Sequence, residues 1–94
     1  MTKGTFWLEE RPGGGVTIGI EDYNVESLGG SDYEWSYTLD CRNRIKMTRI
    51  LAESQKGSLE QMIAAEFGRH LDKKSIRLWL HANGIKYEFF SWVS

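Results

Sequence analysis

The chain has 94 residues but only one cysteine, one proline and two histidines. Cys41 cannot form an internal disulfide by itself, and a secreted domain of this size usually carries several, so we expect cytoplasmic residence. No apolar run approaches the ~20 residues that a membrane-spanning helix needs. No apolar segment follows Lys3, as one would in a secretory signal. These absences argue against secreted and membrane-spanning classes.

Residues suited to catalysis or metal binding are equally scarce. Neither His70 nor His81 has another ligand-type residue at a recognised metal spacing. Cys41 with a remote histidine is a conceivable nucleophile–base pair, yet no local signature supports it. Gly13–Gly15 lack the Gly-Lys-Ser/Thr ending of a phosphate-binding loop, so we expect a hairpin loop there. We therefore predict a protein without enzymatic activity, metal or cofactor.

What the chain does contain is charge divided between its two halves. Residues 1–40 hold two basic and eight acidic residues, whereas residues 41–94 hold ten basic and five acidic ones. The formal net charge of −1 conceals this division. Six of the acidic residues fall between positions 21 and 40. A dipolar surface of this kind bears on partners and on electrostatic steering rather than on fold.

Size and composition indicate a folded protein with one domain, residues 1–94. The chain is 40% hydrophobic and 27% charged, and it contains four each of Trp, Tyr and Phe. Disordered segments have low hydrophobicity and few aromatic residues. A chain of this length has room for a single hydrophobic core.

Alternation of apolar and polar residues predicts strands in the N-terminal half, at 5–10, 16–21 and 33–40. The Pro12–Gly15 run separates the first two predicted strands and predicts a hairpin loop between them. Residues 22–32 are predicted to form a polar loop. The segment 44–51 is ambiguous, because its apolar residues fit either a fourth strand after a turn at 41–43 or a helix, and we favour the strand.

The C-terminal half contains one clear helix signal. Ser58 and Gln61 form a capping-box pattern, and apolar residues follow at helical spacing. Apolar and polar residues alternate along segments 75–82 and 85–93, which flank Asn83-Gly84, and this pattern favours a hairpin with a type I′ turn. The rival interpretation is a helix over 75–82 that Gly84 caps. The favoured order is β-β-β-β-α-β-β, an α+β fold with a mostly antiparallel sheet and one helix packed on it.

Two surfaces are candidate binding sites. The first combines carboxylates with aromatic rings, a combination that steers and anchors a basic protein partner. It consists of Glu21, Asp22, Tyr23, Glu26, Asp32, Tyr33, Glu34 and Trp35. The alternative is a solubilising outer face with Trp35 and Tyr33 turned into the core.

The second candidate surface is the outer face of the predicted C-terminal hairpin. It consists of Arg77, Trp79, His81, Lys86, Phe90 and Trp92, with Glu88 on the same face. Burial against the first hairpin, a protein interface, and stacking of single-stranded nucleic acid are the three interpretations left open.

These observations predict a small module that binds a basic protein through its acidic-aromatic surface. One biological form is a bacterial immunity protein that inhibits a nuclease-type toxin by covering its cationic cleft. The alternative is a nucleic-acid-binding domain that uses the basic aromatic face of the C-terminal hairpin. No membrane partner is expected, and a homodimer is a further alternative.

Overall fold

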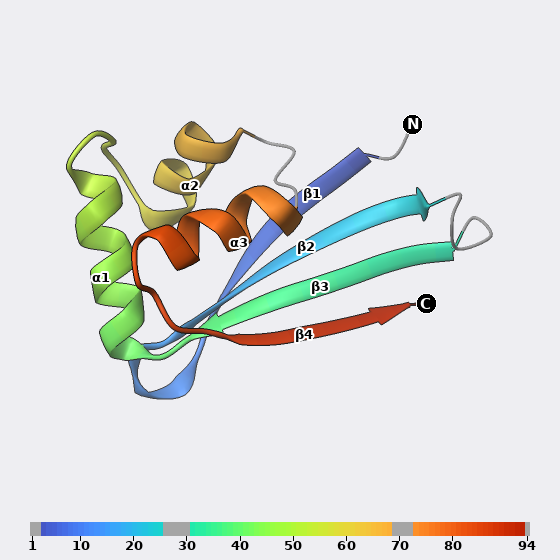
Figure 1. Ribbon diagram of the computed structural model, residues 1–94, viewed down its shortest axis with the longest axis horizontal. Helices are drawn as coiled ribbons and strands as arrows, with labels where there is room; N and C mark the ends of the chain where they lie inside the picture. The colour runs from blue at the N-terminus through green and yellow to red at the C-terminus, as the bar shows by residue number, and fades with distance from the viewer. Residues whose placement is uncertain (1–2, 26–30, 69–72, 94) are drawn as a thin grey trace.

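In the computed structural model, residues 3–25, 31–68 and 73–93 are described, and they build an antiparallel sheet with helices packed on one face (Figure 1). In chain order the elements are β1 (Lys3–Glu10), a short 3-10 helix η1 (Pro12–Gly14), β2 (Val16–Val25), β3 (Ser31–Leu39), α1 (Cys41–Ala52), α2 (Leu59–Phe67), α3 (Lys73–Ala82) and β4 (Glu88–Val93). The predicted α+β fold with an antiparallel sheet is confirmed. Within these ranges, no helix has the length and apolar character needed to cross a bilayer.

The sheet has the strand order β1-β2-β3-β4, and every neighbouring pair is antiparallel. The predicted Pro12–Gly15 hairpin loop is confirmed, and η1 lies in it. Gly13 and Gly14 have φ angles of 81° and 90°, which glycine adopts without a steric penalty. The predicted polar loop at 22–32 is too long, because β2 continues to Val25 and β3 begins at Ser31.

One face of the sheet carries the hydrophobic core. Alternate residues of the two central strands are buried on this face, and each helix adds two more buried side chains. The cluster comprises Val16, Ile18, Ile20, Trp35, Tyr37, Leu39, Met47, Leu51, Met62, Ile63, Ile76, Leu80 and Ile85. We call this side of the sheet the helix-covered face.

The strand predicted at 44–51 is wrong, because this segment belongs to α1. The Asp40 carboxylate accepts a hydrogen bond of 2.8 Å from the backbone N–H of Asn43, which caps the helix N-terminus. Met47 and Leu51, four residues apart, are buried, whereas Ile45 is 50% exposed. The apolar period is therefore that of a helix, and the Asp40 cap is the signal that the strand prediction overlooked.

The predicted C-terminal hairpin is also wrong, and the rival interpretation of a capped helix is correct. Gly84 has φ of 64° and ends α3. The N–H of Gly84 donates to the carbonyl of His81 at 3.2 Å, and the N–H of Ile85 donates to that of Leu80 at 2.9 Å. This pair of bonds defines a Schellman motif. Asn83-Gly84 thus stops a helix, and of the predicted strand 85–93 the part from Glu88 pairs with β3.

The helix predicted from Ser58 is confirmed as α2. Its capping box is complete, because the Ser58 hydroxyl accepts from the Gln61 N–H at 3.2 Å and the Gln61 side chain accepts from the Ser58 N–H at 2.8 Å. Met62 and Ile63 face the core. The described residues therefore form three α-helices and four strands, where the sequence favoured one helix and six strands.

Candidate functional site

The second face of the sheet has a different character from the helix-covered face. The strand register assigns to it ten residues whose side chains are described, and we call this surface the open face, because none of the described helices adds a residue to it. These ten residues are Trp7, Glu9, Thr17, Gly19, Glu21, Glu34, Ser36, Thr38, Glu88 and Phe90. An antiparallel sheet with one solvated face is expected to be polar there. This one combines acidic and aromatic residues instead.

Trp7 occupies the centre of the open face. Its indole ring lies over Gly19, the residue paired with it on β2, and a Cβ atom at Gly19 would overlap that ring. Thr17 and Ser36 are buried polar residues beside Gly19 on the same face. The Thr17 hydroxyl lies 2.9 Å from that of Thr38, so a hydrogen bond joins β2 to β3. The Trp7 ring therefore packs against the middle of β2 on the open face.

Each strand of the sheet contributes one glutamate to the open face: Glu9, Glu21, Glu34 and Glu88. Glu9 and Glu88 are exposed, and Glu21 and Glu34 are half-buried. Glu9 lies 3.7 Å from the guanidinium of Arg11, with both side chains largely exposed, so solvent screens this pair. The four carboxylates concentrate negative charge on one side of the sheet.

Glu21 and Glu34 are direct cross-strand partners. Both side chains are half-buried, so this pair places two carboxylates side by side on the open face.

Phe90 supplies the second aromatic side chain of the open face. It is 68% exposed, the most exposed of the large hydrophobic side chains described. Its cross-strand partner is Ser36, which in turn pairs with Gly19 beneath Trp7. A ring this exposed on a surface with carboxylates is a candidate contact for a partner.

The predicted acidic surface is only partly assembled by the structure. Glu21 and Glu34 lie together on the open face, as predicted. Trp35 is wrong as a binding residue, because it is 4% exposed and belongs to the core on the helix-covered face. The sequence alternative that turned Trp35 inward is correct for that residue.

The remaining members of the acidic surface lie at the far ends of β2 and β3. Asp22 pairs with Tyr33 and Tyr23 pairs with Lys3 through their backbones, and Asp32 lies between Ser31 and Tyr33 on β3. The side chains of these four predicted residues are outside the described set. Glu26 lies outside the described residues altogether.

The predicted second surface is divided by the structure, because helix α3 replaces the expected strand. Arg77, Trp79 and His81 belong to α3, and Lys86 lies in the link to β4. Trp79 is half-buried and makes an edge-to-face contact with Phe67, with ring centroids 5.6 Å apart. It therefore packs α3 on α2.

Of the β4 members of the second surface, Phe90 lies on the open face, where it pairs with Ser36. Trp92 pairs with Glu34 through its backbone, and its side chain is outside the described set. The structure thus combines part of the predicted aromatic surface with part of the acidic one. The register of β3 against β4, across three intervening helices, is what brings them together.

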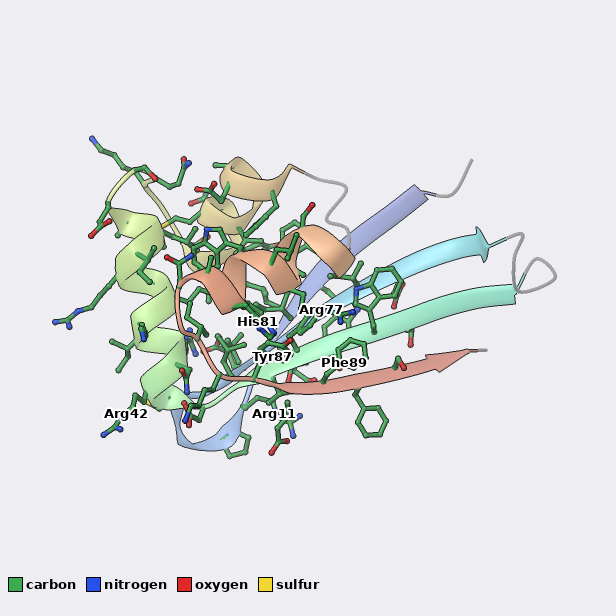
Figure 2. The ribbon with its side chains drawn as sticks, in the orientation of Figure 1. Arg11, Arg42, Arg77, His81, Tyr87 and Phe89 are labelled. Atoms are coloured by element: carbon green, nitrogen blue, oxygen red, sulfur yellow. The ribbon has the colours of Figure 1, made fainter. Side chains whose placement is uncertain are left out.

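Arg77 and His81 nevertheless keep aromatic neighbours. The guanidinium carbon of Arg77 lies 6.0 Å from the centroid of Phe89, and Nε2 of His81 lies 2.9 Å from the hydroxyl of Tyr87 (Figure 2). We call Arg77, His81, Tyr87 and Phe89 the α3–β4 seam. It is a basic aromatic surface on the side of the sheet opposite to Phe90.

A hollow of about 440 Å³ lies at the end of the sheet where α1 begins, and Arg11, Asp40, Cys41 and Lys86 are among its lining residues. Cys41 is an exposed free thiol in this hollow. The Asp40 carboxylate accepts one hydrogen bond from the backbone N–H of Asn43 and a second from the Asn43 side chain. These two hydrogen bonds, the backbone one foremost, hold the pKa of Asp40 below its ordinary value. Asp40 therefore acts as a helix cap. In the described ranges, no group of His, Cys, Asp and Glu is arranged to hold a metal ion.

Glu9 and Trp7 are the site residues that the sequence prediction missed, and Glu88 was assigned to the second surface rather than to the acidic one. Glu9 and Trp7 share one face of the predicted first strand by simple alternation, so that signal was present. Glu88 and Phe90 likewise share one face of their strand by alternation. No local sequence pattern, however, indicates that this strand pairs with β3. No protein-family model, curated protein or solved structure matches this chain.

Proposed function

We propose that this chain is a small cytoplasmic protein-binding module whose open face docks on a basic protein. The observation that carries the proposal is the set of four glutamates, one from each strand, around Trp7 and Phe90. Carboxylates on an interface attract a cationic partner and raise the association rate. Aromatic rings provide the contact area that holds it.

The position of these groups supports binding rather than core packing. Exposed Phe90 and the Trp7 ring over Gly19 share the face with the carboxylates, on a sheet that none of the described helices covers there. A sheet presents its side chains on a rigid backbone, so little conformational entropy is lost when they are contacted. A module of this kind suits a partner with a broad basic surface.

One concrete biological form is a bacterial immunity protein. Such a protein inhibits a nuclease-type toxin by covering the cationic cleft that otherwise holds nucleic acid. The four glutamates take the place of phosphate charges in this arrangement. This proposal rests on the charge and the shape of the open face.

The proposal is tested with a peptide of alternating lysine and valine as the basic probe. In one variant Glu21, Glu34 and Glu88 are all replaced by Gln, and in the matched control Glu53, Glu60 and Glu66, which are exposed on or near the helices, are replaced in the same way. Exposed ion pairs contribute about 0.2–1 kcal/mol each. Loss of three such ion pairs with the peptide is therefore expected to weaken binding about tenfold.

Equal affinities of the two variants for the probe contradict the proposal, because both lose the same charge and differ only in where they lose it. Circular dichroism and the urea midpoint show that both variants remain folded. Increasing salt is expected to narrow the difference between them, since the attraction is electrostatic.

The α3–β4 seam supports a second candidate function, binding of single-stranded nucleic acid. Arg77 lies over the Phe89 ring and the His81 imidazole bonds Tyr87, so a guanidinium and an imidazole lie beside aromatic rings there. Such surfaces bind phosphates and stack bases. A mobility shift of labelled single-stranded RNA at low salt, lost in Arg77→Glu and Lys86→Glu, supports this function. No shift at low salt removes it.

A further inference from the structure

Strand β4 is an edge of the sheet. It pairs with β3 in an uninterrupted register from Glu88 to Val93, and none of the described residues pairs with its other side. Figure 1 shows β4 running along the border of the molecule beyond the helices. Every second backbone N–H and C=O group of an edge strand points outward without a strand partner.

Natural sheets protect their edges with charged residues, proline, bulges or very short strands. The opposite edge strand, β1, is protected in this way, because Glu9 and Glu10 end it and Arg11 and Pro12 follow. On β4 three of the five residues after Glu88 are aromatic. Phe89 is 41% exposed on the helix-covered face and Phe90 is 68% exposed on the open face. After Glu88, this edge carries no charged residue and no proline.

The charges near β4 determine which side chains an added strand can carry. An added strand lies about 4.8 Å from β4, so its side chains on the open face lie beside Glu88 and Phe90, with Glu34 one strand further. Basic and apolar residues are complementary to that row. On the helix-covered face the added strand lies beside Phe89 and near the guanidinium of Arg77, which favours apolar rather than basic residues.

A second copy of the chain fits less well than a basic segment. Two copies joined through antiparallel β4 strands about a twofold axis normal to the sheet place both open faces on the same side. The glutamates of both copies then form one larger acidic surface, and like charges repel across it.

We propose that an extended basic segment of the partner adds to the sheet along β4 as a fifth strand, with basic side chains on the open face and apolar side chains on the helix-covered face. This inference rests on the proposed function of the open face. It specifies how the partner is held, because main-chain hydrogen bonds supply affinity and alternate side chains supply specificity.

The test is amide hydrogen exchange, measured residue by residue by NMR on the full chain with and without the peptide of alternating lysine and valine. Strand addition slows exchange of the alternate β4 amides that point away from β3, by about tenfold or more. The outward amides of β1 serve as the internal control, and their exchange is expected to be unchanged.

The substitution Phe90→Lys adds a cation to the edge and is expected to abolish the protection. Leu78→Lys is the matched control, because Leu78 is an exposed apolar residue on α3, away from the edge, and it is expected to bind the peptide as the parent does. Circular dichroism establishes that both variants fold.

The outcomes separate the two proposals. Binding that depends on the glutamates but leaves the β4 amides unprotected overturns strand addition and leaves the proposed function standing. Failure of the peptide to bind, or binding that does not depend on the glutamates, overturns both. Protection of the β4 amides that rises with protein concentration alone overturns strand addition by a partner and identifies a second copy as the occupant.

Discussion

The two faces of the sheet are built from alternate residues of the same strands, yet they have opposite properties. Ile18, Ile20 and Tyr37 are fully buried beneath the helices, and the interleaved positions carry Gly19, Glu21 and Ser36. The helix-covered face supplies most of the hydrophobic stabilisation, since burial of apolar area drives folding. The open face carries one glutamate from each strand beside Trp7 and Phe90.

This difference indicates which face is available for function. Proteins retain locally unfavourable arrangements at sites that bind, and the stability lost there is offset elsewhere in the fold. The exposed ring of Phe90 belongs to this class. On the helix-covered face, by contrast, the core residues of the two central strands are at most 4% exposed.

The largest expected effect separates the two faces directly. Ile18→Ala creates a cavity in the core and is expected to lower the free energy of unfolding by about 2–5 kcal/mol. Phe90→Ala on the open face is expected to change it by less than about 0.5 kcal/mol. Urea unfolding followed by circular dichroism measures both. A loss for Phe90→Ala comparable with that for Ile18→Ala contradicts the assignment of an exposed binding ring.

A smaller effect is expected where the open face is itself packed. Gly19→Ala forces the Trp7 ring to move and is expected to lower the free energy of unfolding by about 1–3 kcal/mol. The control is the same substitution in a Trp7→Ala background. There the loss is expected to be much smaller, because the overlap is removed. Equal losses in both backgrounds contradict the contact between Trp7 and Gly19.

The end of α3 gives a prediction on the helix-covered side. Gly84 has φ of 64°, so Gly84→Ala is expected to lower the free energy of unfolding by about 1 kcal/mol. Gly84→Asn is the matched variant and is expected to cost less, since asparagine tolerates this conformation better. Thermal unfolding measures the difference. A stabilised Gly84→Ala variant contradicts the Schellman end of α3.

The smallest expected effect is the pH dependence that Asp40 contributes. Hydrogen bonds from Asn43 lower the pKa of this carboxyl below its ordinary value of 3.8. Its stabilising contribution is therefore present above that value and is lost as the pH falls through the lower folded-state pKa. The Asp40→Asn variant keeps a capping oxygen without the titration. The difference in melting temperature between parent and variant is expected to shrink below pH 4, and a constant difference contradicts the cap.

Alternation along the strands was sufficient to predict β1, most of β2 and most of β3, and the capping box predicted α2. The two errors share a cause. Both α1 and α3 have apolar residues that satisfy two periods at once, and the decisive information lay in their ends: Asp40 before α1 and Gly84 after α3. Asn83-Gly84 serves a hairpin turn and a helix end equally well, because both need a positive φ at the glycine.

The candidate site was half predictable for a related reason. Glu21 and Glu34 were predicted, since charge concentration is visible in the sequence. The contributions of Glu88 and Phe90 depend on β4 pairing with β3 across three helices, a long-range contact that no local pattern encodes. Trp35 was misplaced because alternation divides a strand between two faces without saying which face is buried.

The most direct test of the central claim uses the two tryptophans that lie on opposite sides of the sheet. The protein is titrated with the peptide of alternating lysine and valine while the indole N–H signals of Trp7 and Trp79 are followed by NMR. We predict that the Trp7 signal shifts with the peptide and that the Trp79 signal does not. A shift of Trp79 with Trp7 unchanged would place binding on the helix side and contradict the open face as the docking surface.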